Sequence, residues 1–168
     1  MKLASLRAHL LLWLGLPLLI LWALSVYTHY ASALQAANQA YDRSLLASAR
    51  TVAERIRVRH GHLEVDVPWV VLDSFERNMN DQLYYQVISP EGKTLSGYDD
   101  LPSLPKNTPL SKNYPALVHF YYADYNGLPI RLAALWQPVN EDNVQGMALV
   151  IVAETLTSRR DFASSLLS

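Results

Sequence analysis

The stretch LVHFYYADYNGLPIRLAALWQ, residues 117–137, predicts a β-hairpin and with it a sheet-containing domain. Its two arms, Leu117–Tyr125 and Ile130–Gln137, are rich in aromatic and other apolar side chains, as strands are. Asn126-Gly127 stands between the arms, and this dipeptide readily adopts the left-handed backbone of a two-residue hairpin turn. We therefore expect two antiparallel strands paired across Asn126-Gly127.

Further strands are expected on both sides of this hairpin. Leu83–Ser89 and Thr94–Gly97 precede it, joined by the tight turn Pro90-Glu91-Gly92-Lys93. Gly146–Ala153 follows it, and its near-continuous apolar character predicts a central strand covered on both faces. Leu63–Val67 alternates apolar and acidic side chains, which is typical of a half-buried strand.

A long helix is expected before these strands, ending at Gly61. Its apolar stripe, with spacings of three or four, is Leu34, Ala37, Tyr41, Leu45, Ala49, Val52 and Ile56. This stripe suits two readings that are compatible with each other: a helix docked on the domain behind it, or a helix paired with a second copy. A short helix is expected from Pro68, with Val71, Leu72, Phe75 and Met79 on its inner face, and Glu154–Leu167 can form a last helix.

The N-terminal part of the long helix predicts a membrane span. Leu10–Val26 contains no charged side chain, and its flanks extend it to roughly the 20 residues that cross a bilayer. Lys2 and Arg7 precede this run, and the next basic Lys or Arg is Arg43. This asymmetry predicts a cytoplasmic N-terminus and an exported domain.

A cleaved signal peptide is the alternative, because Ala31-Ser32-Ala33 resembles a cleavage site. The apolar run is longer than the usual signal core of about 7–15 residues, and the cut would fall inside a continuing helix, so an uncleaved anchor is favoured. The expected organisation is residues 1–9 cytoplasmic, 10–29 transmembrane, 30–158 periplasmic, and 159–168 the start of a helix that leads toward a second span absent from these residues.

The predicted fold class is α+β: a transmembrane helix, then a long helix, a short helix and a five-stranded antiparallel sheet. This order of elements is that of PAS-like extracytoplasmic sensor domains. By analogy, we expect helices on one face of the sheet and a ligand cavity between the sheet and the Pro-rich connection, residues 101–115.

Composition excludes several function classes. The net charge of −1 gives no basic surface for nucleic acid, and the absence of cysteine excludes disulfides, thiolate zinc sites and a thiol nucleophile. No phosphate-binding glycine motif occurs, and no set of catalytic residues stands out, so we predict neither a cofactor nor catalysis within these residues.

Arg131 is the main candidate for ligand binding, because it is the only cation in an apolar strand and its planar guanidinium suits a carboxylate. The candidate set for a di- or tricarboxylate is Arg131, His119, Tyr85 and Tyr121, with Lys106 or Lys112 as a further cation. The alternative is that Arg131 is a surface residue, paired with Asp124 or solvated.

Two other groups carry side chains that can bind ions. His60-Gly61-His62 with Glu64 and Asp66 carries metal-ligand side chains, but a solvated turn explains it without a metal, and we predict none. Tyr98-Asp99-Asp100 could bind a cation or cap a helix, but a solvated turn is the simpler interpretation.

Several segments together resemble one family. They are YDRSLLASARTVAERI (41–56), VDVPWVVLDSFERNMNDQLYYQVISPEGKTLSGYDDLP (65–102), the hairpin Tyr121–Leu135, and VIVAETLTSR (150–159). They resemble the N-terminal region of two-component sensor histidine kinases of the tricarboxylate-transport sensor (TctE-like) type, related to the quorum-sensing sensor kinases. The resemblance runs from about Leu6 to Arg159, and its most specific motifs are Tyr41–Leu45, Tyr84-Tyr85 and Gly97–Pro102.

The resemblance implies a receptor in the bacterial inner membrane, expected as a homodimer. A small periplasmic ligand would shift its helices and thereby set autophosphorylation in a cytoplasmic kinase core, which passes phosphate to a response regulator. No kinase residue lies within these 168 residues. The alternative function is a membrane-tethered periplasmic interaction module without a small-molecule ligand; an exported enzyme is disfavoured, since no nucleophile or metal set is present.

Overall fold

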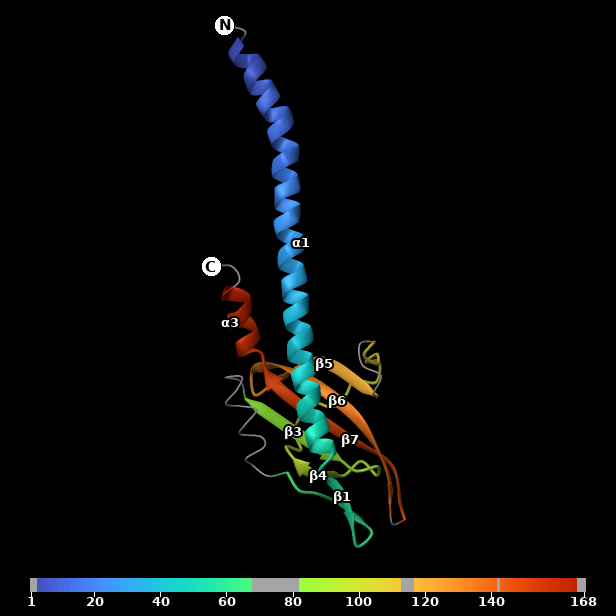
Figure 1. The fold of residues 1–168 in the computed structure, drawn as a ribbon. Coiled ribbons are helices and arrows are strands. Elements are labelled where there is room, and N and C mark those ends of the chain that lie inside the picture. The colour runs from blue at the N-terminus through green and yellow to red at the C-terminus, as the bar shows by residue number, and fades with distance from the viewer. Residues whose placement is uncertain (1–2, 68–81, 113–116, 142, 166–168) are drawn as a thin grey trace. The chain divides into compact units, whose positions relative to one another are not determined.

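The computed structural model describes residues 3–67, 82–112, 117–141 and 143–165 (Figure 1). The chain forms two compact units, Met1–Gln39 and Ala40–Ser168. Helix α1 (Leu3–Ala53) is continuous across the boundary, so that its first part belongs to the first unit and its last part to the second.

The first unit is the apolar part of α1. Its large apolar side chains are exposed, Leu11 at 74% and Trp13 at 75% of their surface, which is unfavourable in water and favourable in lipid. Among the described residues, α1 is the one helix with the length and apolar composition to cross a membrane. Pro17 lies within it without interrupting the helix.

The second unit contains an antiparallel five-stranded sheet. Its strands are β3 (Leu83–Ile88), β4 (Thr94–Gly97), β5 (Val118–Tyr125), β6 (Leu128–Glu141) and β7 (Val144–Thr155), in the spatial order β4-β3-β7-β6-β5. This confirms the predicted α+β class and the five predicted strands. The most apolar strand, β7, lies at the centre between β3 and β6, as its composition predicted.

The hairpin of β5 and β6 is confirmed at its predicted turn. Asn126 and Gly127 have φ angles of 51° and 77°, both left-handed, and Tyr125 pairs with Leu128 across them. In the resulting register Arg131 stands opposite Tyr122 on one side and opposite Glu154 of β7 on the other. The turn thereby positions the residues of the site described below.

Strands β6 and β7 are longer than predicted, and they pair with each other as far as Glu141 and Val144. β6 continues through Pro138, although proline has no N–H to donate a hydrogen bond to a neighbouring strand. The pairing of β5 with β6 stops at Val118 opposite Leu135, so on that side of Pro138 there is no strand that would need such a hydrogen bond. The two strands therefore continue as a two-stranded ribbon.

The predicted helix end at Gly61 was wrong. α1 ends at Ala53, and a small hairpin follows, made of β1 (Ile56–Arg59) and β2 (His62–Val65). The sequence IRVR alternates apolar and basic side chains, so its period of two suits a strand, although Ile56 also fits the helical stripe. The short helix expected from Pro68, with Val71, Leu72, Phe75 and Met79, lies outside the described residues.

The last helix was predicted to start at Glu154, which was also wrong. Glu154 and Thr155 continue β7, because they pair with Arg131 and Ile130 of β6, and α3 covers Thr157–Ser165. The register of the sheet therefore overrides the helix propensity of these residues.

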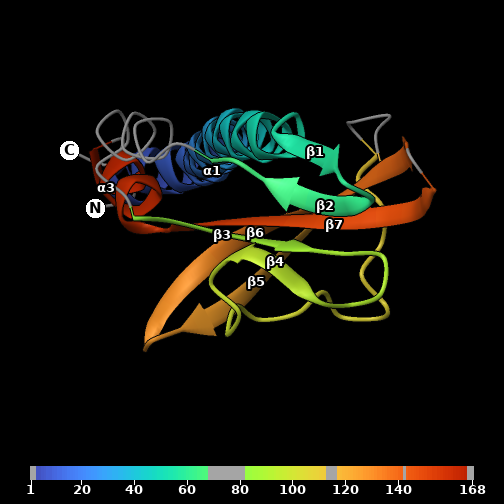
Figure 2. The same ribbon diagram turned by 90° about the horizontal axis from the view of Figure 1, so that it is seen from below.

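The sheet has two covered faces (Figure 2). On the helix face, the last part of α1 and the β1–β2 hairpin lie against the sheet, with Leu45, Ala49 and Val52 among the buried helix residues. On the loop face, the connection between β4 and β5 contributes Leu101 and Leu104 to a second apolar cluster. The reading of α1 as a docked helix is confirmed for its residues 45–53, while its pairing with a second copy stays a prediction.

Candidate functional site

Four charged side chains form an ionic cluster on the helix face of the second unit. The cluster consists of Asp42 on α1, Arg131 on β6, Glu154 on β7 and Arg159 on α3. Their side chains are 15%, 14%, 2% and 7% exposed, respectively, so the cluster is largely removed from water. Two cations and two anions balance, which is the condition for burying charge.

Asp42 is the shared member of this ionic cluster. Its carboxylate accepts two hydrogen bonds from Arg131, from Nε at 3.1 Å to Oδ1 and from Nη2 at 2.7 Å to Oδ2. The Oδ1 atom also accepts a bond of 2.9 Å from Nη2 of Arg159. Arg159 in turn donates from Nε and Nη2 to Oε1 of Glu154, at 3.2 and 2.6 Å. The bidentate geometry at Arg131 is the strongest form of this contact.

Aromatic rings lie next to both guanidinium groups. The Cζ atom of Arg131 lies 4.2 Å from the ring centroid of Tyr122 and 5.3 Å from that of Phe120. The Cζ atom of Arg159 lies 5.1 Å from the ring centroid of Tyr41, whose hydroxyl donates to the carbonyl of Ser158 at 3.3 Å. Such cation–π contacts favour the charged guanidinium where water is excluded.

The surroundings of Arg159 keep it charged. Burial disfavours the guanidinium cation, but the hydrogen bonds and negative charges of Glu154 and Asp42 outweigh this, so the pKa of Arg159 lies above its ordinary value. Arg159 is therefore a charged donor to both carboxylates.

Within the second unit, the ionic cluster joins the last part of α1 to α3. Asp42 lies on α1 and Arg159 lies on α3, and the two side chains form an ion pair with each other. Asp42 also pairs with Arg131 and Arg159 with Glu154, and these two partners stand opposite each other on the adjacent strands β6 and β7. A shift of either helix would change the contacts of Asp42 and hence the position of the other. This arrangement can couple the two helices mechanically.

The structure does not bring the four predicted ligand residues together. Arg131 and Tyr85 lie on the helix face, and His119 and Tyr121 lie on the loop face. Arg131 holds Asp42, not Asp124, and Tyr85 shares a hydrogen bond of 2.9 Å with Ser96. The further cations Lys106 and Lys112 are exposed on the connection.

Side chains on the loop face of the sheet form hydrogen bonds to the backbone of the Pro-rich connection. His119 Nδ1 lies 2.9 Å from the carbonyl oxygen of Thr108, and the Tyr121 hydroxyl donates to the carbonyl of Pro102 at 2.9 Å. Tyr84 makes edge-on contacts with Tyr98 and Tyr125, at centroid distances of 5.2 and 5.0 Å. The Gly97–Pro102 motif is thus explained as the segment that these side chains hold against the sheet.

Tyr125 gives this loop-face contact a pH dependence. Its hydroxyl donates to Asp100 at 2.8 Å, and this bond, together with burial and the Asp100 charge, raises the pKa of Tyr125 to about 12 from 10.0. Because the folded pKa is the higher one, its contribution to stability is complete below pH 10 and is lost as the pH rises to about 12. We expect the thermal midpoint of the chain to fall over this range, and Tyr125→Phe to reduce the fall.

This expectation can be checked by circular dichroism melts between pH 8 and 12. Tyr122→Phe, on an exposed tyrosine of the same strand, should leave the fall unchanged. An equal fall in the wild type and in Tyr125→Phe would contradict the role of Tyr125.

A groove lies between the end of α1 and strand β6. It has a volume of about 520 Å³ and is lined by Arg50, Ala53 and Glu54 on one side and by Leu117 and Leu135–Pro138 on the other. This volume falls within the range of about 300–1,000 Å³ that is usual for small-molecule sites. The groove lies on the helix face, whereas the cavity predicted from the sequence would lie beneath the connection on the loop face.

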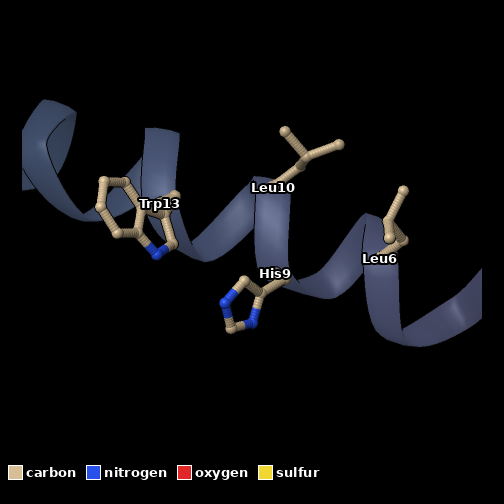
Figure 3. A pocket seen from close by; sticks show the side chains of 4 residues that line it. All are labelled: Leu6, His9, Leu10 and Trp13. Carbon is tan, nitrogen blue, oxygen red and sulfur yellow. The ribbon is translucent and has the colours of Figure 1, made fainter.

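A second hollow is formed by α1 alone. Leu6, His9, Leu10 and Trp13 line it, and all four extend from neighbouring turns of one helix (Figure 3). These side chains belong to the apolar helix of the first unit, so the hollow is a depression on the surface of that helix.

His60 and Gly61 form the turn between β1 and β2, and His62 is the first residue of β2. Nδ1 of His62 lies 3.0 Å from the carbonyl oxygen of His60. Both histidines are exposed. In the described part of the chain, no three His, Asp or Glu side chains come together as metal ligands do.

Sequence reasoning missed Asp42, Glu154 and Arg159 as members of one site. A signal was present, because Asp42 lies in YDRSL and the other two lie in VIVAETLTSR, both segments that carried the family resemblance. A second signal was Glu154 at the end of an otherwise apolar run, since a buried acid needs a cationic partner.

A known family matches most of the chain. The family model described as two-component sensor kinase N-terminal matches residues 18–166, which include the last part of the apolar segment, the sheet and α3. No curated protein shows significant similarity to the chain. Because the match covers far more than half of the residues, the chain belongs to the two-component sensor kinase N-terminal family.

Proposed function

We propose that the chain is the signal-input region of a two-component sensor histidine kinase, in which the second unit detects a periplasmic ligand and α1 and α3 transmit the response. The observation that carries this proposal is the ionic cluster, because one carboxylate, that of Asp42, contacts arginines on both β6 and α3. A sensor needs such a connection between its ligand-binding body and the helices that lead to the membrane.

The mechanism is a population shift between two arrangements of the helices. In the arrangement described here Asp42 satisfies both arginines. A ligand that prefers another position of α1 on the sheet would strain or break these bonds and thereby displace α3. The displacement would set autophosphorylation of a kinase core, from which phosphate passes to a response regulator.

Topology and assembly belong to the same proposal. Lys2 and Arg7 before the apolar run support a cytoplasmic N-terminus in the bacterial inner membrane, with the second unit in the periplasm. The strand order β4-β3-β7-β6-β5 supports a PAS-like domain. The motifs Tyr41–Leu45 and Gly97–Pro102 support the tricarboxylate-transport sensor type, and homodimers are the form in which we expect this receptor to act.

We expect Asp42→Asn to change basal autophosphorylation by at least about fivefold in the full-length kinase reconstituted in nanodiscs. The substitution keeps the shape of the side chain but removes the charge that links α1 to α3, and coupling between sites is typically worth a factor of about 5–150. The measurement is transfer of radiolabelled phosphate from ATP.

Asp124→Asn is the matched control, because Asp124 is exposed on β5 and lies outside the ionic cluster. An Asp42→Asn kinase with wild-type basal activity and an unaltered response would contradict coupling through the cluster. The kinase assignment itself is tested by the gene sequence beyond codon 168, where a stop codon in place of a second span and a kinase core would overturn it.

A further inference from the structure

The hollow on the first part of α1 lies where the apolar run of this helix begins. Its lining residues, Leu6, His9, Leu10 and Trp13, extend over about 10 Å of helix. The run without charged side chains starts at Leu10, so His9 directly precedes it and Trp13 lies about one turn inside it. When this helix spans a bilayer, the hollow therefore lies at the boundary between the headgroup layer and the hydrocarbon core.

The dimensions of a bilayer suit this placement of the hollow. The polar layer adds about 5–8 Å on each side of a hydrocarbon core that is about 30 Å thick. A hollow of about 10 Å along the helix thus covers the headgroup layer and the outermost part of the core. Tryptophan is enriched at this depth, because its ring is apolar and its N–H is polar.

His9 and Trp13 place two hydrogen-bond donors next to each other in the hollow. They are four residues apart, so they lie on one side of the helix, where Figure 3 shows the imidazole and indole rings as neighbours. The indole N–H only donates, and the imidazole carries at least one N–H in either protonation state. Within the described ranges, neither side chain has a hydrogen-bond partner, and both are exposed. Both donors are therefore available to one acceptor at headgroup depth.

The charges around the hollow favour an anionic acceptor. Lys2 and Arg7 precede the apolar run, and the sequence contains no Asp or Glu before Asp42. Basic side chains at this position attract anionic lipid headgroups over about a Debye length. A zwitterionic headgroup such as that of phosphatidylcholine carries a cation of its own, which the same basic side chains repel.

We propose that the hollow binds the headgroup of one anionic phospholipid. The lipid phosphate accepts hydrogen bonds from His9 and Trp13, Arg7 adds electrostatic attraction, and the first part of an acyl chain lies against Leu10. A lipid bound in this way fixes the depth of α1 in the membrane. The inference concerns the membrane anchor, so it goes beyond the proposed function and does not depend on it.

The experiment is native mass spectrometry of the full 168-residue chain, released from detergent micelles after titration with phosphatidylglycerol or with phosphatidylcholine of the same acyl chains. We expect phosphatidylglycerol to bind at least about fivefold more tightly, which is the usual contribution of one basic residue at an anionic membrane surface. Inorganic phosphate at millimolar concentration should not displace the lipid, because it lacks the acyl chains. Displacement by inorganic phosphate would show a site for free phosphate and would contradict the lipid site.

Substitutions on the same helix locate the site. His9→Leu and Trp13→Phe each remove one donor, and each should weaken phosphatidylglycerol binding about fivefold, the usual effect of one hydrogen bond. His29→Leu and Trp22→Phe make the same chemical changes at exposed positions farther along α1, and they should leave the binding unchanged. These four positions are exposed on the helix, so the substitutions remove no buried contact.

Three further results would overturn the inference. They are equal binding of the two lipids, phosphatidylglycerol binding that is indifferent to both His9→Leu and Trp13→Phe, and an equal loss of binding in His29→Leu or Trp22→Phe. The ionic cluster takes no part in this measurement, so such a result leaves the expected effect of Asp42→Asn on the kinase standing.

Discussion

Replacing Glu154 with glutamine is expected to lower the free energy of unfolding of the second unit by about 3–5 kcal/mol, the usual cost of breaking a buried ion pair from one side. The Glu154 side chain is 2% exposed, and its Oε1 accepts both hydrogen bonds from Arg159. Without its charge, one carboxylate remains for two guanidinium groups, and a buried cation is left without its counter-charge.

Chemical unfolding of the full chain in detergent micelles, followed by near-ultraviolet circular dichroism, measures this cost. The control is Glu141→Gln on the exposed end of β6, for which a change within about 0.5 kcal/mol is expected. The double variant Glu154→Leu/Arg159→Met should be more stable than Glu154→Gln, because it removes both charges together. Equal stability of Glu154→Gln and the wild type would show that the ionic cluster is not formed in solution.

Gly97→Ala is expected to cost about 2–5 kcal/mol, through backbone strain and steric overlap together. Gly97 has a φ of +87°, and a Cβ atom there would overlap the carbonyl oxygen of Tyr85 and lie 2.8 Å from its carbonyl carbon. The overlapping atoms belong to the backbone of β3, which pairs with both β4 and β7 and cannot easily move. We therefore expect β4 and the following segment to be displaced.

Gly92→Ala is the matched control, because Gly92 has nearly the same φ, +86°, with no atom within 4 Å of the added Cβ. It should cost only the strain, about 1–2 kcal/mol. The same unfolding experiment measures both variants. An equal loss in the two would mean that the overlap with Tyr85 is relieved without cost.

Local patterns predicted most of the sheet. The Asn126-Gly127 turn and the apolar run Gly146–Ala153 depend on neighbouring residues, and both were placed correctly. The predictions failed where two local readings competed. Ile56 fits a helical spacing and a strand alternation, and Glu154 fits a helix start and a strand end, so only pairing with partner strands decided between them.

The candidate site was predicted only in part, for a related reason. Arg131 was singled out as the only cation in an apolar strand, and its partner was expected to be Asp124 or a ligand, whereas the structure pairs it with Asp42. Asp42 is 89 residues away in the chain, and no local rule brings it to Arg131. Tyr85 and Tyr121 likewise point to opposite faces of the sheet. Which residues of a strand face α1 is decided by how the helix docks on the sheet, and not by the sequence of that strand.

The amino-acid sequence by itself determined the apolar N-terminal helix, the antiparallel strands and the turns between them. These features arise from side-chain periodicity and backbone preference over a few residues. The tertiary structure alone decided the ionic cluster and the groove, because Asp42 and Arg50 meet β6 only once α1 is docked on the sheet. Docking and strand register are properties of the whole domain, and they turn separate charged residues into one site.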